Sequence, residues 1–181
     1  MKGEEKMDSL VALKINLLTL IRLAKTELWD SLEDLKANQE NILRCKEKRT
    51  NNSEAMIKSM KNLSSIFIEI IINNNNKLLE YYEELKKFKD IKTPGESSYE
   101  YNPHLEEINE LQHKLENSIS LLAETIKKEK EYNTRFNNSN IKVILSQTEF
   151  YSQKILFDYE ELNKAKLKYY NNRYPNLSIR K

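Results

Sequence analysis

The sequence predicts an all-α protein, an elongated antiparallel helical bundle or coiled coil of three to four long helices. Two glycines and three prolines among 181 residues are too few for the many tight turns of a sheet protein. Apolar residues also recur at alternating steps of three and four, which places them on one face of a helix. Charged residues make up 32% of the chain, which suits narrow helix seams better than one large core. We therefore expect a single bundle domain over residues 9–171, after a disordered N-terminus at 1–8 and before a basic tail at 172–181.

The first helix is expected over about 9–49, with Asp8 and Ser9 as its N-terminal cap. Its apolar stripe is broad in the N-terminal half, where Leu18 and Leu23 widen it, so that half could contact two neighbouring helices. The polar stretch that follows carries several basic side chains. These indicate either a solvated turn or a contact with an anionic surface. The stripe comprises Leu10, Leu13, Leu17, Leu20, Ile21, Ala24, Leu28, Leu32, Leu35 and Ile42.

The second helix, expected over 54–91, has the most regular seam and is the candidate partner interface. Eight apolar seam residues share one face: Ile57, Met60, Phe67, Ile71, Leu78, Tyr81, Leu85 and Phe88. The stretch from Ile66 to Ile72 is apolar nearly all round, so we expect the most buried point of the molecule there. Because the phase continues across Asn73–Asn76, the helix is predicted to be uninterrupted. Asn74 then either fixes register from a buried seam position or lies at a solvated edge.

A third helical region is expected over 103–171, after a Pro- and Gly-containing break, with Asn102-Pro103 as cap and first-turn residue. Its apolar stripe begins with Leu105, Ile108, Leu111, Leu115, Ile119, Leu122 and Ile126. The next apolar set, Phe136, Val143, Phe150 and Phe157, recurs at steps of seven. This spacing passes through the turn-forming residues 137–140. A turn there gives four helices, and continuity gives three. The unbroken phase favours one long, kinked third helix.

The segment from Asn163 to Lys181 holds six basic residues, three tyrosines and no acid. Basic residues interleaved with tyrosines suit contact with phosphates or lipid headgroups. Basic residues at the C-terminal end of a helix also interact favourably with the helix dipole, and this requires no ligand. The candidate contacts with an anionic surface are Lys164, Lys166, Lys168, Arg173, Arg180 and Lys181.

No pattern of catalytic, metal-binding or cofactor-binding residues is present, so we expect no enzyme activity, no cofactor, no metal and no small-molecule substrate. With two glycines the chain has no phosphate-cradling loop. Glu110-x-x-His113 matches half of a di-iron signature, but no second such motif occurs. Cys45 is the only cysteine, which fits a reducing compartment. Without a signal peptide or a run long enough to cross a bilayer, the expected location is cytoplasmic or nuclear.

The leading functional hypothesis is a coiled-coil structural or adaptor subunit of a multi-protein intracellular complex, which pairs with other helical proteins or with itself as a homodimer. The alternative is a peripheral membrane protein, because long helices with a basic corner and a basic end are similar in outline to the crescent-shaped BAR-type dimers. A weaker third hypothesis is a nucleic-acid accessory factor that uses the tail. A net charge of +2 does not favour nucleic acid as the main partner.

Overall fold

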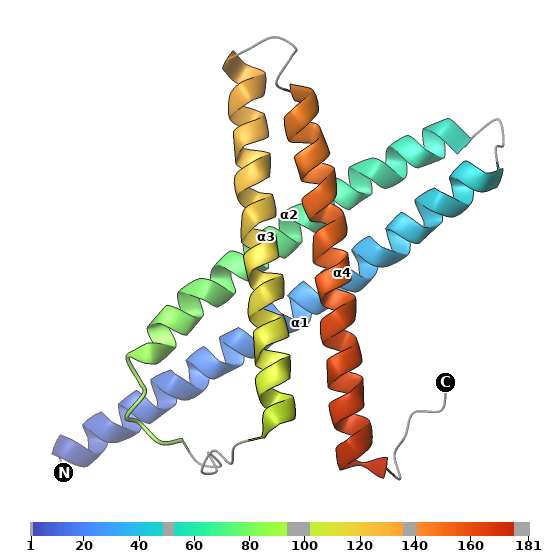
Figure 1. Cartoon of the computed structure of the whole chain (residues 1–181). Coiled ribbons are helices and arrows are strands. Elements are labelled where there is room, and N and C mark those ends of the chain that lie inside the picture. The colour runs from blue at the N-terminus through green and yellow to red at the C-terminus, as the bar shows by residue number, and fades with distance from the viewer. Residues whose placement is uncertain (1, 49–52, 94–101, 136–140, 176–181) are drawn as a thin grey trace. The chain divides into compact units, whose positions relative to one another are not determined.

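The computed structural model contains four helices: α1 (Lys2–Lys48), α2 (Ser53–Lys86), α3 (Pro103–Arg135) and α4 (Ile141–Arg173) (Figure 1). The structure describes residues 2–48, 53–93, 102–135 and 141–175, and leaves out the side chains of residues 2–6, 48, 133–135 and 141–146. Of the described residues, 94% are helical and none is in a strand. The prediction of an all-α fold is confirmed. Helix α1 begins at Lys2, before the predicted cap at Asp8 and Ser9.

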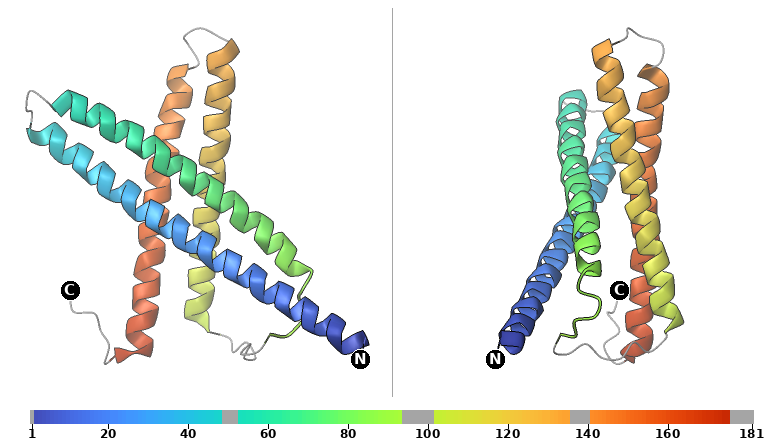
Figure 2. Two further views of the ribbon diagram at one scale, coloured as in Figure 1. Left: turned by 180° about the vertical axis from the view of Figure 1, so that it is seen from behind. Right: turned by 90° about the vertical axis from the view of Figure 1, so that its left-hand side faces the viewer.

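The helices pack in two pairs, α1 with α2 and α3 with α4 (Figure 2). The chain accordingly divides into two compact units, Met1–Tyr99 and Glu100–Lys181. Each unit is a hairpin of two antiparallel helices, a common helical motif. We call them hairpin 1 and hairpin 2. A single bundle domain over 9–171 stays a prediction.

The preference for one long third helix was wrong. Residues 137–140 lie outside the described residues, but α3 and α4 on either side of them lie side by side. Thr148 of α4 donates a hydrogen bond to Glu129 of α3 (3.1 Å), and further along Ser118 bonds to Asp158 (2.6 Å). From one pair to the next the residue number rises in α4 and falls in α3, so the two helices are antiparallel. The described residues therefore form four helices.

In hairpin 1, α1 packs against the predicted seam of α2. Ile71 and Leu78 are fully buried, and α2 continues without a break through Asn73–Asn76, as predicted. Asn74 is 2% exposed, so the buried alternative for this residue holds. The matching positions of α1 also alternate at steps of three and four: Lys14, Leu17, Ile21, Ala24, Leu28, Ser31, Leu35, Asn38 and Ile42, all buried except the half-buried Leu17.

Polar contacts at two levels set the register of hairpin 1. The Asn38 side-chain amide donates to the Met60 carbonyl oxygen (2.6 Å) and to the Ser64 hydroxyl (2.8 Å). At the other end, Lys14 Nζ donates to the Ile91 carbonyl oxygen (2.5 Å), just beyond the end of α2. A slip of one residue would break both contacts and bury the wrong side chains.

Hairpin 2 begins as predicted, because Asn102 Oδ1 accepts a hydrogen bond from the His104 backbone amide (3.0 Å) and Pro103 opens the helix. The seam of α3 follows the predicted stripe, but the seam of α4 does not. Phe150 and Phe157 are more than half exposed. Val143 and Phe136 lie outside the residues whose side chains are described. The buried apolar residues are Ile108, Leu115, Ile119 and Leu122 of α3, as predicted, with Ile155, Tyr159, Leu162 and Ala165 of α4, which were not predicted.

Candidate interaction surfaces

Seven of the eight predicted seam residues lie on the face of α2 that packs against α1, and Phe88 lies in the turn after α2, which ends at Lys86 and not at residue 91 as predicted. Ile71 and Leu78 are buried, and the other six, Ile57, Met60, Phe67, Tyr81, Leu85 and Phe88, are partly exposed. The seam is thus already used within the chain. A role for these residues toward a partner stays a prediction.

A second apolar stripe runs along α2 beside the seam. Met56, Leu63, Ile66 and Ile70 follow at steps of seven, three and four, each one residue before a seam position, and are 39–53% exposed. We expected the most buried point of the molecule between Ile66 and Ile72, but this stretch is not buried on all sides. Ile71 is fully buried, whereas Ile66 and Ile70 lie on the adjacent face and are exposed. Apolar residues on two adjacent faces explain why that stretch is apolar nearly all round.

Helix α1 carries an equivalent group in its N-terminal half. Leu13, Leu20 and Leu23 are 44–56% exposed and also lie one residue before the seam positions Lys14, Ile21 and Ala24. In an antiparallel pair, a twofold axis normal to the hairpin relates the two helices, so equivalent positions lie on the same face. The two groups lie toward opposite ends of hairpin 1, because Lys14 contacts Ile91 and Asn38 contacts Met60 and Ser64. We call the seven residues of both groups the second stripe: Leu13, Leu20, Leu23, Met56, Leu63, Ile66 and Ile70.

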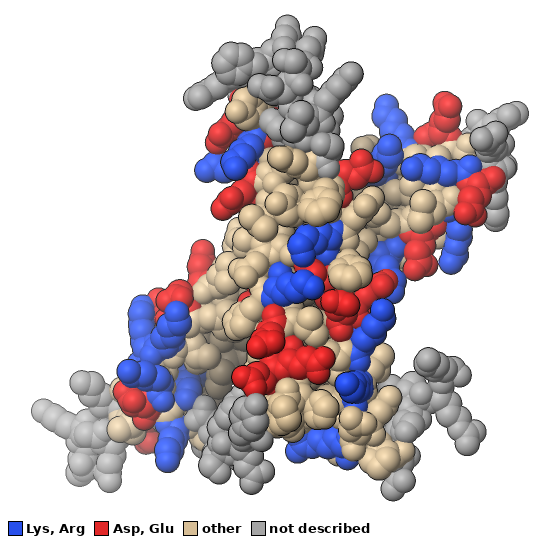
Figure 3. Space-filling view, viewed as in Figure 1, with Lys and Arg blue, Asp and Glu red and all other residues tan. Residues whose placement is uncertain are grey.

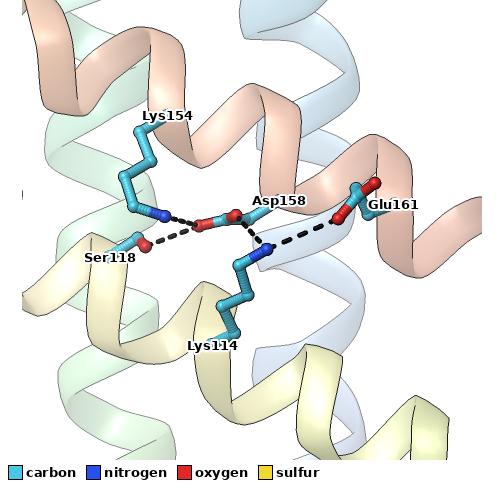
Figure 4. A network of polar contacts seen from close by, with 5 residues as sticks. All are labelled: Lys114, Ser118, Lys154, Asp158 and Glu161. Carbon is cyan, nitrogen blue, oxygen red and sulfur yellow. Dashed lines mark hydrogen bonds and ion pairs between the residues drawn. The ribbon is translucent and has the colours of Figure 1, made fainter.

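A polar cluster lies at the interface of α3 and α4 in hairpin 2 (Figure 4). The carboxylate of Asp158 is fully buried, and its Oδ2 accepts hydrogen bonds from Ser118 (2.6 Å) and Lys154 (2.7 Å). Lys114 of α3 approaches Asp158 Oδ1 at 3.2 Å and Glu161 at 3.4 Å. The two lysines keep 31% and 44% of their side-chain surface in solvent, so only the carboxylate is buried.

The electrostatics of this cluster favour a charged Asp158. Burial is the largest single influence on the pKa of Asp158 and raises it, but the hydrogen bonds from Lys154 and Ser118 and the contact with Lys114 together outweigh burial and hold the pKa below its ordinary value. The contact with the Asp158 carboxylate in turn raises the pKa of Lys114. An ionised carboxylate held by two ammonium groups ties α3 to α4 and is a poor proton acceptor.

Sequence reasoning missed this cluster, although one signal was visible. Asp158 lies within the arc of α4 that contains Ile155, Tyr159 and Leu162, which is the apolar arc of the helix. A charged residue among core positions requires a partner. Lys154, four residues earlier, is at the spacing that supplies one.

The basic residues near the C-terminus of α4 cluster with tyrosines. Lys164 and Lys168 are exposed, Lys166 is partly exposed, and Arg180 and Lys181 lie outside the described residues. Arg173 donates to the Tyr169 hydroxyl (2.5 Å), and its guanidinium lies 5.9 Å from the ring centroids of both Tyr169 and Tyr174. The contact with the Tyr169 hydroxyl raises the pKa of Arg173. The structure therefore brings aromatic and cationic groups together at this end.

Elsewhere, acidic and basic side chains are interspersed on the visible surface of both hairpins (Figure 3). In the part of the chain that the structure describes, no helix is long and apolar enough to cross a membrane. Within the same residues, no group of three or more histidine, cysteine, aspartate or glutamate side chains is arranged to hold a metal ion.

Comparisons with protein-family models, with curated proteins and with solved structures gave no match for this chain.

Proposed function

We propose that the protein is a non-enzymatic coiled-coil adaptor subunit of a cytoplasmic or nuclear multi-protein complex, and that it binds a helical partner, or a second copy of itself, through the second stripe. The observation that supports this most is that hairpin 1 leaves heptad-spaced apolar residues exposed after its own seam is closed. On α2 the stripe from Met56 to Ile70 extends about 21 Å at 1.5 Å per residue. That is three to four turns of a partner helix.

The exposure of these side chains carries a free-energy cost in water. Burying apolar surface is favourable by about 25 cal/mol per Å², and contiguous exposed apolar patches commonly mark interaction sites. A stripe with steps of three and four is the shape that another amphipathic helix covers best. The partner proposed here is accordingly a helix with an apolar stripe of similar length.

The absence of enzyme activity is part of the proposal. Asp158 is the kind of buried, pKa-shifted carboxylate that often marks an active site. Here its pKa is lowered, and Ser118, Lys114 and Lys154 hold it in a closed set of contacts. This arrangement supports a structural role for the group.

The test is the substitution Ile66→Asp, with Ser65→Asp as a matched control. Ile66 lies in the second stripe, whereas Ser65 is exposed on another side of the same helix. We expect Ile66→Asp to lose stoichiometric partners in affinity isolation from the native cell, and any self-association in analytical ultracentrifugation. Circular dichroism should show unchanged helicity. The control should keep the complex.

A substitution in the seam itself, such as Phe67→Asp, is less discriminating because Phe67 also packs within hairpin 1 and its loss could unfold the hairpin. The proposal is wrong if Ile66→Asp retains every assembly of the wild type. It is equally wrong if the wild-type protein is isolated alone and sediments as a monomer.

A further inference from the structure

The C-terminal end of α4 has an exposed apolar and aromatic stripe of its own. Leu167, Tyr170 and Tyr174 follow at steps of three and four and are 50%, 57% and 46% exposed. The buried residues of the same segment, Leu162 and Ala165, mark a different face. The stripe therefore points away from the core of hairpin 2.

Basic side chains flank this stripe on both sides. At about 100° per residue, Lys164 and Lys168 lie on one side of it, and Lys166 and Arg173 lie on the other. No acid occurs between residues 162 and 175. Cations around an apolar stripe at the end of a helix form an amphipathic segment.

We infer that this end of α4 binds the surface of a bilayer that contains anionic phospholipid. Leu167, Tyr170 and Tyr174 enter the boundary between headgroups and acyl chains, where tyrosine is favoured. The lysine stems extend along that boundary and place their ammonium groups at the phosphates. The site lies on hairpin 2, whereas the second stripe lies on hairpin 1.

Two simpler explanations account for only part of the pattern. Basic residues in the last turn of a helix interact favourably with the helix dipole. That interaction does not explain why a leucine and two tyrosines are exposed on the same face of the helix. Single-stranded nucleic acid binds to basic and aromatic surfaces by stacking. Leu167 has no ring to stack on, and Arg173 already lies over the rings of Tyr169 and Tyr174.

The neighbouring helix limits the strength of this binding. The first turns of α3 lie beside this end of α4 in the antiparallel hairpin and carry Glu106, Glu107 and Glu110. Their negative charge opposes approach to an anionic surface. We therefore expect binding that is reversible and that falls as salt is raised.

The experiment is co-sedimentation of the full chain with phosphatidylcholine vesicles, with and without phosphatidylserine, at low and at physiological salt. The wild type should sediment with the anionic vesicles and not with the neutral ones. Lys164→Glu/Lys168→Glu and Leu167→Ser/Tyr170→Ser should each lower binding by about tenfold or more. Lys58→Glu/Lys61→Glu, which reverses two exposed lysines of α2, should bind as the wild type does.

The outcomes separate this inference from the adaptor proposal. Ile66→Asp should leave vesicle binding unchanged, because Ile66 lies on hairpin 1. Failure of the wild type to sediment with anionic vesicles at low salt would overturn the inference. Binding to a single-stranded oligonucleotide that exceeds vesicle binding and is unaffected by Leu167→Ser would replace it with nucleic-acid recognition.

Discussion

At the scale of single residues, Asp158 shows how a buried charge is held in an otherwise apolar helix pair. Its carboxylate is fully buried and contacts three donors from two helices. Removing one member of such a set leaves the others without their partner. The cost is moderate where the lysines can turn to water, as both can here.

We predict that Asp158→Asn destabilises the protein by about 1–2 kcal/mol at neutral pH, because two charge-assisted hydrogen bonds become ordinary or are lost. Urea unfolding followed by circular dichroism measures the change. Glu161→Gln is the matched control, because Glu161 is 39% exposed and contacts Lys114 at 3.4 Å. Exposed ion pairs contribute little, so this variant should lie within about 0.5 kcal/mol of the wild type.

The pH dependence of this difference has a definite sign. The folded-state pKa of Asp158 is lowered from the ordinary value of 3.8, so the folded state favours the ionised form. Its contribution is fully present above that ordinary value and is lost as pH falls through the lower folded value. The stability difference between the wild type and Asp158→Asn should therefore shrink in strong acid. A difference that grows in acid would show that burial dominates.

Residue-scale details were only partly predictable from the sequence. The cap at Asn102 follows from local chemistry and was predicted. The bond from Asn38 to Ser64 joins residues far apart in the chain, so it requires knowledge of the pairing register. The same holds for Ser118 and Asp158. Contacts across a hairpin depend on how the two helices align, which one helix's periodicity does not contain.

At the scale of the element, α2 shows that packing can override a poor local preference. Four consecutive asparagines are weak helix formers, yet they lie inside continuous helix. Asn74 and Asn75 are buried, and Asn73 and Asn76 are exposed. The seam residues on either side hold the helix through this run.

This division predicts opposite effects for two double substitutions in the run. Asn73→Ala/Asn76→Ala should stabilise the protein by about 1 kcal/mol in total, because alanine has the higher helix propensity and both positions face solvent. Asn74→Ala/Asn75→Ala should destabilise it, because buried volume and polar contacts are removed. Thermal and urea unfolding measure both variants. Equal effects of the two pairs would contradict the assigned burial.

Element-scale periodicity was informative where it coincided with burial and misleading where it did not. In α2 the step pattern identified the face that packs on α1, including the buried Asn74. In α4 the steps of seven through Phe150 and Phe157 identified an exposed face. Every heptad position repeats at seven residues, whether or not it faces the core. The steps of three and four around Ile155, Tyr159 and Leu162 were the better guide.

At the scale of the whole molecule, each hairpin contains what a separate folding unit needs. Hairpin 1 has its own seam and the polar contacts of Asn38 and Lys14. Hairpin 2 has its own seam and the Asp158 cluster. Long amphipathic helices gain most of their stability from packing against a partner, and here the partner adjoins in sequence. Contacts that are close in sequence also favour fast folding.

We therefore predict that residues 1–99 and 100–181, produced as separate polypeptides, each remain helical and unfold cooperatively. Their circular dichroism spectra, added in equal molar amounts, should reproduce the spectrum of the full chain. An equimolar mixture of the two should show no gain in helicity over that sum. A fragment that is unstructured alone and becomes helical on mixing would show that one hairpin folds only on the other. In that case the seam within each hairpin would be insufficient to stabilise its fold.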